Sequence, residues 1–320
     1  MKRIYIQWVA FLLIILASYG TVQNPFTAQY VSGLKMDYQA LPVTKVLDPL
    51  YEEIREKAKE YEKAPQNAEV HKVWKSTPGY NGLKVDVKAS YENMKKSKKF
   101  DPKKLVLKES SPSRHLSDLP PNAIYRGHPD KKMVSFIINV AWGNEYIPTI
   151  LETLKKHNVN ATFFLEGRWV KENPDMAKMI VDAGHEVGNH SYSHPNMKTL
   201  TTSLVRQELV KTNDVIEATT GKTPTLFAPP SGSYRQEVVD IASELDMETI
   251  MWSVDTIDWQ KPSPEVLTNR VLSKVHPGAL VLMHPTESTA KSLDQLIIAI
   301  KEKKLRIDEV SSLLSEKRAD

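Results

Sequence analysis

The sequence contains no cysteine among its 320 residues. This absence excludes disulfide bonds, cysteine nucleophiles and thiolate-based zinc sites. Any metal site must therefore use histidine, aspartate or glutamate side chains. Neither sign of charge dominates: 43 lysine and arginine residues against 39 aspartate and glutamate residues give a formal net charge of +4 and a pI near 8.9. This mild basic excess favours an anionic neighbourhood such as a cell wall or a phospholipid surface.

One long apolar run stands at the N-terminus. Lys2 and Arg3 precede an apolar segment over residues 4–17. A basic start followed by an apolar segment is typical of a secretory signal peptide or a signal anchor. We therefore expect residues 1–20 to direct export to the cell envelope, either cleaved or retained as the only membrane-associated part of the chain. We expect residues 21–40 to form a tether.

Residues 41–109 show a mixed helix and strand pattern. Apolar residues at helical spacing predict one amphipathic helix, Asp86 can cap a second, and short apolar runs predict strands. The predicted elements are helices over 47–61 and 87–96, and strands over 69–75, 83–85 and 105–107. We expect a small N-terminal α/β domain with a role in docking or positioning. The prolines of residues 110–130 predict a linker.

The densest basic segment of the chain spans residues 95–104. Nucleic-acid binding is one interpretation of such a segment. The export signal argues against it, and a solvated helix end is the simpler interpretation. We expect no nucleic-acid partner.

From residue 133 onward, strand-like runs alternate with amphipathic helices. The predicted strands are 133–140, 161–165, 186–189, 225–228, 249–254, 279–283 and 306–310, and the helices between them are 146–157, 170–183, 203–218, 236–245, 264–275 and 289–301. This alternation predicts parallel strands with helical crossovers over residues 131–320, in an open sheet or a closed barrel. In a barrel, the chemistry lies at the carboxyl ends of the strands.

The most informative chemical motif is the pair His190 and His194, which ends in Pro195. The pair follows a short apolar run over residues 184–189, so both imidazoles are expected at the carboxyl end of a strand. Neutral imidazole is a common metal ligand, and two histidines four residues apart can converge on one ion. The pair therefore supplies two of the three protein ligands that an open metal site needs.

Further motifs flank this pair in a fixed order. They are Ala-Thr-Phe-Phe-Leu at 161–165, Asn-His-Ser-Tyr-Ser-His-Pro at 189–195, Phe-Ala-Pro-Pro-Ser-Gly at 227–232, Asp-Thr-Ile-Asp-Trp at 255–259 and Leu-Met-His-Pro at 282–285. Over residues 130–312 these motifs resemble the polysaccharide deacetylase family, also called NodB-homology or carbohydrate esterase family 4. Trp-Gly-Asn-Glu-Tyr at 142–146 is similar to the exported, sporulation-associated branch of Bacillus-type bacteria.

The resemblance implies a distorted seven-stranded (β/α) barrel that hydrolyses the acetamide of N-acetylated cell-wall glycan, peptidoglycan or a chitin-like polymer. It implies a divalent metal, zinc before cobalt or another ion, held by one aspartate and two histidines, which His190 and His194 match. It also implies an aspartate base that acts on metal-bound water, with an arginine that braces the base.

The resemblance further assigns His284 as the histidine that protonates the leaving amine, with Asp255 or Asp258 holding its imidazole. Trp142 and Trp259 are candidate walls of a sugar groove because aromatic faces suit pyranose rings. The remaining candidate substrate-binding residues form the loop Pro229, Pro230, Ser231 and Gly232.

Three positions depart from the family pattern. Asn139 stands where the base is expected, Val140 where the metal-binding aspartate is expected, and Ala228 where the bracing arginine is expected. An amide does not accept a proton in the useful pH range, and loss of a general base costs about 10²- to 10⁴-fold in rate. A bracing cation has no partner once the base is an amide, so these losses indicate a reorganised site.

Three hypotheses follow from these departures. The first is a deacetylase-fold envelope protein with weak or absent activity that retains His190 and His194 as a residual metal site. The second is an active amidohydrolase whose base has moved to Glu145 or Asp255. The third is a non-catalytic glycan-binding or sporulation scaffold protein.

Overall fold

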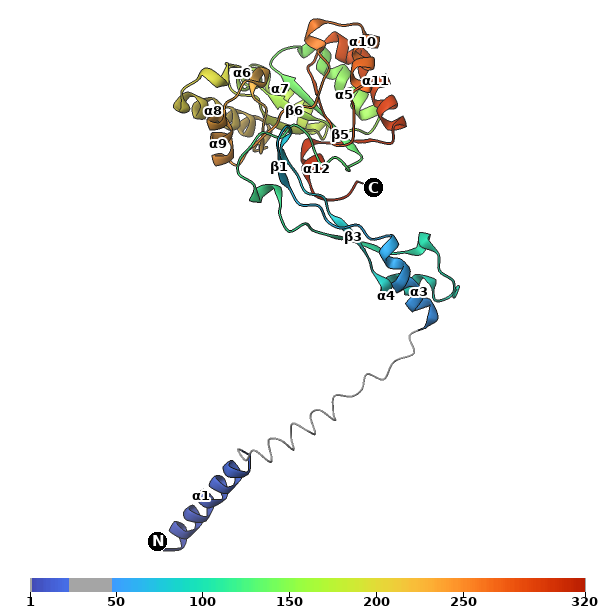
Figure 1. Cartoon of the computed structure of the whole chain (residues 1–320). Helices are drawn as coiled ribbons and strands as arrows, with labels where there is room; N and C mark the ends of the chain where they lie inside the picture. The colour runs from blue at the N-terminus through green and yellow to red at the C-terminus, as the bar shows by residue number, and fades with distance from the viewer. Residues whose placement is uncertain (1, 23–47, 320) are drawn as a thin grey trace. The chain divides into compact units, whose positions relative to one another are not determined.

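The computed structural model of the chain describes residues 2–22 and 48–319 (Figure 1). The chain divides into two compact units. The first unit is Met1–Lys59 with Asp86–Val106, and the second is Glu60–Val85 with Leu107–Asp320. The tether expected at residues 21–40 lies outside the described residues, apart from residues 21 and 22.

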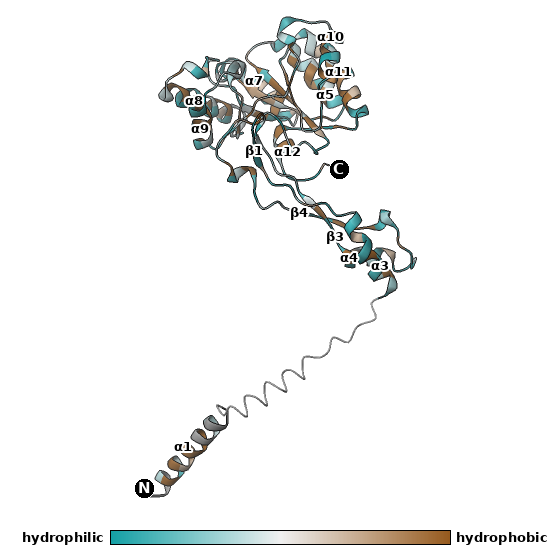
Figure 2. Cartoon of the chain, in the orientation of Figure 1, coloured by the Kyte–Doolittle hydropathy of each residue, from teal (hydrophilic) through white to brown (hydrophobic). Residues whose placement is uncertain are grey.

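The first unit contains the N-terminal helix α1 (Lys2–Val22), which covers the apolar run (Figure 2). No helix within residues 2–22 and 48–319 combines the length and the apolarity needed to cross a membrane. The unit also contains α3 (Pro49–Lys57) and α4 (Val87–Met94). Both begin at an aspartate cap: the side chain of Asp48 accepts a hydrogen bond from the amide of Leu50, and that of Asp86 from Ala89.

A small buried cluster joins α3 to α4. Leu50 and Ile54 of α3 are buried against Met94 of α4. The predicted helices 47–61 and 87–96 are thus present in shorter form. Position 47 itself lies outside the described residues.

Four short strands open the second unit. They are β1 (Glu69–His71), β2 (Lys75–Thr77), β3 (Gly82–Val85) and β4 (Leu107–Ser110), and they form the antiparallel pairs β1–β2 and β3–β4. The single strand predicted at 69–75 is wrong, because the chain reverses there and His71 pairs with Lys75. Nδ1 of His71 accepts hydrogen bonds from the amides of Val73 and Trp74, which stabilises the reversal.

The main sheet consists of parallel strands in the order β10-β11-β5-β6-β7-β8-β9, and β12 also pairs with β5. The strands are β5 (Met133–Val140), β6 (Thr162–Leu165), β7 (Glu186–Asn189), β8 (Leu226–Phe227), β9 (Glu248–Thr249), β10 (Val254–Asp255), β11 (Leu280–Met283) and β12 (Arg306–Ile307). The curled seven-strand path confirms the predicted α/β barrel class. Among the described residues no ladder joins β9 to β10, so the barrel is open between them.

Helices follow the strands as predicted, with one correction to a helix and one to a strand. They are α5 (Ile147–Lys156), α6 (Gly167–Glu172), α7 (Pro174–Asp182), α8 (Thr202–Thr220), α9 (Gln236–Glu244), α10 (Pro264–Leu272), α11 (Glu287–Glu302) and α12 (Val310–Leu314). The helix predicted at 170–183 is two helices, because Pro174 lacks the amide that would continue α6. The strand predicted at 249–254 is two strands, β9 and β10, at opposite ends of the sheet path.

Short 3-10 turns connect several of these elements. They are η1 (Ala58–Glu60), η2 (Pro102–Lys104), η3 (Leu116–Asp118), η4 (Asn144–Tyr146), η5 (Met197–Thr199), η6 (Pro230–Gly232) and η7 (Asp258–Gln260). Three of them contain residues of the sequence motifs: η4, η6 and η7, which follow β5, β8 and β10 at their carboxyl ends.

The central strand β5 is buried along its whole length and separates two cores. Ile138 and Val140 pack with the helices, whereas Ile137 packs inside the barrel with Phe164 and Leu282. Alternate residues of a strand point to opposite faces. Asn139 therefore shares the inner face with Ile137, at the end where the motifs gather.

Candidate functional site

A cavity of about 440 Å³ lies at the carboxyl ends of the barrel strands. Eight of the residues singled out in the sequence line it: Asn139, Trp142, His190, His194, Ser231, Asp255, Trp259 and His284. Ala141, Trp252 and Leu282 complete the lining. Segments that are more than a hundred residues apart in the chain thus meet in one cavity.

His190 is held in an orientation that suits a metal ligand. It is 2% exposed, and its Nδ1 lies 2.8 Å from the carbonyl oxygen of Ala228. A carbonyl oxygen can only accept, so Nδ1 carries the proton and Nε2 keeps its lone pair. Burial, with a smaller contribution from His194, lowers the pKa of His190 to about 3. The imidazole therefore stays neutral at physiological pH.

The loop after β7 brings His194 next to His190. The centroids of the two rings lie 5.1 Å apart, and burial also lowers the pKa of His194. Ser191 and His194 both adopt positive φ angles, +62° and +55°. This tight conformation points both imidazoles into the same cavity.

Glu208 of α8 fixes the backbone of this loop. Its carboxylate accepts hydrogen bonds from the amides of Tyr192 and Ser193 and from the Ser193 hydroxyl, each at 2.8 Å. The Asn189 side chain accepts a fourth bond from the amide of Ser191. The sequence analysis missed Glu208, since nothing distinguishes it from other acidic residues of an amphipathic helix.

Asp258 is the carboxylate that holds His284. It is fully buried, and its Oδ1 lies 2.8 Å from Nδ1 of His284. Its Oδ2 accepts hydrogen bonds from the His284 amide at 2.6 Å and from the Thr289 hydroxyl at 2.6 Å. The alternative partner, Asp255, instead accepts a bond from the Ile257 amide and lines the cavity.

Three tryptophans form much of the cavity wall. Trp142 stacks on His284 with ring planes 8° apart and centroids 6.0 Å apart. Trp142 and Trp259 remain 47% and 55% exposed. Trp252 is an unpredicted wall residue, and a Cβ on Gly232 would collide with its ring. Pro229, Pro230 and Gly232 are not among the lining residues and support Ser231 from η6.

The first motif places an amide in the cavity. Asn139 is 5% exposed, and its Oδ1 is buried without a hydrogen-bond partner. Asn139 lines the cavity, so this oxygen is available to accept a hydrogen bond from a ligand there. Val140 is fully buried on the helix side of β5 and offers nothing to the cavity.

These residues do not complete the family's metal site. Within the described chain, no group of three or more histidine, aspartate or glutamate side chains is arranged to hold a metal ion. The donors in the cavity are the imidazoles of His190 and His194 and the neutral amide oxygen of Asn139, whereas an open zinc site uses three strong protein ligands. Glu145 lines a neighbouring cavity, beside Trp142 and Trp259, and is not among the residues around His190.

Comparison with known proteins gives a consistent result. The model of the polysaccharide deacetylase family matches residues 126–250. The chain is 53% identical to the uncharacterized protein YlxY of Bacillus subtilis over 99% of both chains. It is 32% identical to the peptidoglycan-N-acetylmuramic acid deacetylase PdaA of Bacillus subtilis over 61% of this chain and 76% of PdaA.

Solved structures show the same relationship. BA3943, a CE4 family pseudoenzyme from Bacillus anthracis, is 64% identical with a TM-score of 0.81, over 85% of this chain and 96% of BA3943. A BA3943 mutant with restored enzymatic activity matches at 62% identity with the same TM-score, over 84% of this chain and 99% of the mutant. With the barrel and its motifs in place, these matches show that the chain belongs to the polysaccharide deacetylase family, carbohydrate esterase family 4.

Proposed function

We propose that this protein binds N-acetylated glycan of the bacterial cell wall in its barrel cavity and releases little or no acetate from it. The observation that carries the proposal is Asn139, a buried amide with an unpartnered oxygen at the position of the base. An amide cannot take the proton that hydrolysis requires, which removes about 10²- to 10⁴-fold in rate. The incomplete metal ligand set, and the alanine at position 228 where the bracing arginine is expected, also lower the expected rate of hydrolysis.

Glycan binding is supported by the parts of the cavity that are retained. Trp142 and Trp259 expose aromatic faces on which a pyranose ring can stack. His284 remains fixed by Asp258, whose carboxylate accepts the Nδ1 proton, so Nε2 of the neutral ring can accept a hydrogen bond from a glycan hydroxyl. Relatives named as peptidoglycan deacetylases share the barrel, and BA3943 is described as a pseudoenzyme. A family member that has lost turnover can thus keep the groove for recognition.

The cellular location in this proposal is the outer face of the cell envelope. Residues 1–20 act as the export signal or anchor, and residues 131–320 form the glycan-binding barrel. Residues 41–109 position the barrel near the wall, with residues 110–130 as the linker. The positive net charge suits that anionic environment. A role in sporulation is part of the proposal, because the segment at 142–146 is similar to the sporulation-associated branch of the family.

The experiment measures binding and hydrolysis on the same samples. The full chain is titrated with N-acetylglucosamine oligomers by calorimetry, and acetate is assayed with and without zinc. We expect binding without acetate above the zinc-only blank. Trp142→Ala should weaken binding about ten-fold through loss of stacking, whereas Leu204→Ala, a similarly exposed side chain on α8, should not. Failure of the oligomers and of soluble peptidoglycan fragments to bind would contradict the proposal.

One observation favours a second candidate function, an amidohydrolase with a relocated base. Asp255 lines the same cavity as His190 and His284, whereas Glu145 does not. Under this alternative, protein-dependent acetate release would be detected and Asp255→Asn would abolish it. Under the proposal above, there is no release for Asp255→Asn to abolish.

A further inference from the structure

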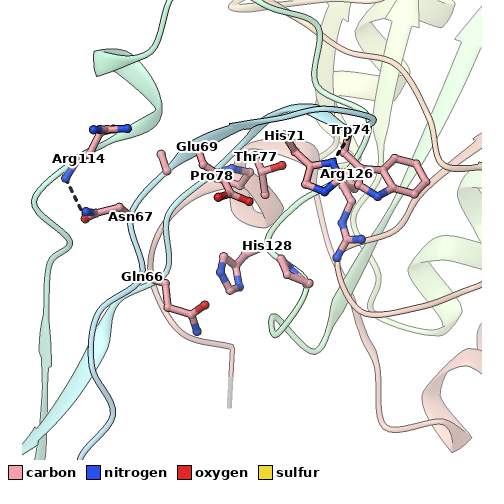
Figure 3. Close-up of a pocket in the computed structure, with 12 residues that line it drawn as sticks. Gln66, Asn67, Glu69, His71, Trp74, Thr77, Pro78, Arg114, Arg126 and His128 are labelled. Carbon is pink, nitrogen blue, oxygen red and sulfur yellow. Dashed lines mark hydrogen bonds between the residues drawn. The ribbon is translucent and has the colours of Figure 1, made fainter.

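A second cavity, of about 610 Å³, lies against the β1–β2 hairpin and shares no lining residue with the barrel cavity (Figure 3). The hairpin contributes Glu69, His71 and Trp74, and later segments contribute Arg114, Arg126 and His128. All of these residues belong to the second unit. Neither the family motifs nor the barrel cavity assigns these side chains a ligand.

Arg126 is a half-buried cation in this cavity. Its guanidinium lies over the Trp74 ring, 5.5 Å from the centroid, and its Nε donates to the Gly127 carbonyl at 3.3 Å. Burial lowers its pKa, although an arginine stays protonated at any physiological pH. No carboxylate of the described chain forms an ion pair with it, and Asp130, the nearest to influence it, accepts a hydrogen bond from Gln66. A partly desolvated cation of this kind gains most from an anionic ligand.

Two imidazoles in the cavity are fixed as donors. Nδ1 of His71 accepts from the amides of Val73 and Trp74, and Nδ1 of His128 accepts from the Asp130 amide. A neutral ring whose Nδ1 accepts must carry its proton on Nε2. Burial lowers the pKa of His128, so that ring stays neutral, and it stacks on Tyr80 with centroids 4.9 Å apart.

The other charged residues of the lining favour a ligand that combines an oxyanion with hydroxyl groups. Arg114 is exposed, and its backbone is fixed by a bond from its amide to Oδ1 of Asn67. The Arg114 side chain lies across the hairpin from Arg126, so the cavity sets Arg126 and two imidazole donors against one carboxylate, Glu69 (Figure 3). An arginine fork matches carboxylate and phosphate oxygens, while a carboxylate such as Glu69 accepts from sugar hydroxyls.

We propose that this cavity binds an anionic sugar, a pyranose that bears a carboxylate or phosphate group. Arg126 contacts the oxyanion, the His71 and His128 Nε2 protons contact ligand oxygens, and Glu69 accepts a hydroxyl. The cavity is within the range of about 300–1,000 Å³ typical of small-molecule sites and is larger than a bare anion requires. The protein then has a second glycan contact that is independent of its barrel cavity.

The test titrates the full chain with glucuronic acid, glucose 6-phosphate, glucose and inorganic phosphate by saturation-transfer NMR and calorimetry. At least one of the two acidic sugars should bind about ten-fold or more tightly than glucose and than inorganic phosphate. The acidic sugar that binds more tightly identifies whether the site selects a carboxylate or a phosphate group. Trp142→Ala, which alters the barrel cavity, should leave this binding unchanged.

The variants assign the binding to the cavity. Arg126→Gln should weaken the acidic sugar at least about ten-fold, and Arg126→Lys, which keeps the charge but not the planar fork, several-fold. Lys72→Gln removes a positive charge from the same hairpin outside the cavity and should bind like wild type. If Arg126→Gln does not fold, Arg126→Lys carries the test. Equal binding of glucose, equal binding of inorganic phosphate, no binding, or wild-type affinity in the arginine variants would overturn the proposal.

Discussion

His284 and Asp258 form the most completely hydrogen-bonded part of the barrel cavity. Asp258 accepts three hydrogen bonds while fully buried, whereas Asn139 leaves its oxygen unpartnered in the same cavity. Under the proposed function, Asp258 and His284 are the retained half of the site, and they contribute to stability or to ligand binding.

Removal of the buried Asp258 carboxylate tests its contribution to stability. Asp258→Ala leaves the Nδ1 and amide of His284 and the Thr289 hydroxyl without their acceptor, so we expect a loss of about 2–4 kcal/mol in the free energy of unfolding. Asp255→Ala removes one bond at a half-buried residue and should cost about 1 kcal/mol. Urea denaturation monitored by circular dichroism measures both values. Equal losses of unfolding free energy in the two variants would contradict the assignment of Asp258, rather than Asp255, as the partner of His284.

His185 lies outside the motifs and provides a pH-dependent contribution to stability. It is 7% exposed, and burial lowers its pKa to about 4. The unfolded chain takes up a proton at this residue below about pH 6.5, and the folded protein does not until about pH 4. The free energy of unfolding should therefore fall as pH drops through this window, with a contribution on the order of 2 kcal/mol at pH 5.

A glutamine at this position isolates the effect. His185→Gln keeps an acceptor for the Ala161 amide but does not titrate in this range. The difference in unfolding free energy between wild type and variant should change by on the order of 2 kcal/mol between pH 7 and pH 5. Parallel pH curves would show that His185 does not resist protonation in the folded protein.

At the scale of elements, the loops at the strand ends depend on a few backbone contacts. Glu208 forms three hydrogen bonds with the loop that carries His190 and His194. Glu208→Ala should therefore increase amide hydrogen exchange at Tyr192 and Ser193 about ten-fold or more, while the amides of β7 keep their protection. Unchanged exchange at these two amides would show that the loop is held by other contacts.

Gly143 fixes the turn between β5 and η4. Its φ is +84°, and an added Cβ would collide with the carbonyl oxygen of Pro285, next to His284. Gly221, which ends α8, also has a positive φ of +69° but has open space around it. Gly221→Ala should cost about 1–2 kcal/mol through backbone strain alone, and Gly143→Ala measurably more. Thermal or urea unfolding of the two variants compares them directly, and a smaller cost at Gly143 would contradict this argument.

The sequence predicts the buried elements well and the short ones poorly. The bounds of β5 and β7 match the prediction residue for residue. The segment 249–254 is a continuous apolar-rich run, and nothing in it signals that the chain leaves one edge of the sheet for the other. Contacts between distant elements, such as Glu208 with the loop after β7 or Trp252 in the cavity wall, leave no local pattern either.

At the scale of the whole molecule, the chain combines a family barrel with a cavity in which an amide, Asn139, lies beside His190 and His194. The sequence motifs were sufficient to predict that their residues face one cavity, because the carboxyl ends of parallel strands meet at one edge. They did not predict the second cavity at the β1–β2 hairpin, which depends on the pairing of His71 with Lys75 and on arginines far along the chain.

The central claim is that turnover is absent because the position of the base holds an amide. The most direct test is acetate release from N-acetylglucosamine oligomers by wild type and by Asn139→Asp, each with its bound zinc measured. We predict no acetate above the zinc-only blank for wild type and measurable acetate release for Asn139→Asp, because a carboxylate at this position can take the proton that the amide cannot. Protein-dependent acetate release by the wild-type chain, at a rate that Asn139→Asp does not raise, would contradict the account.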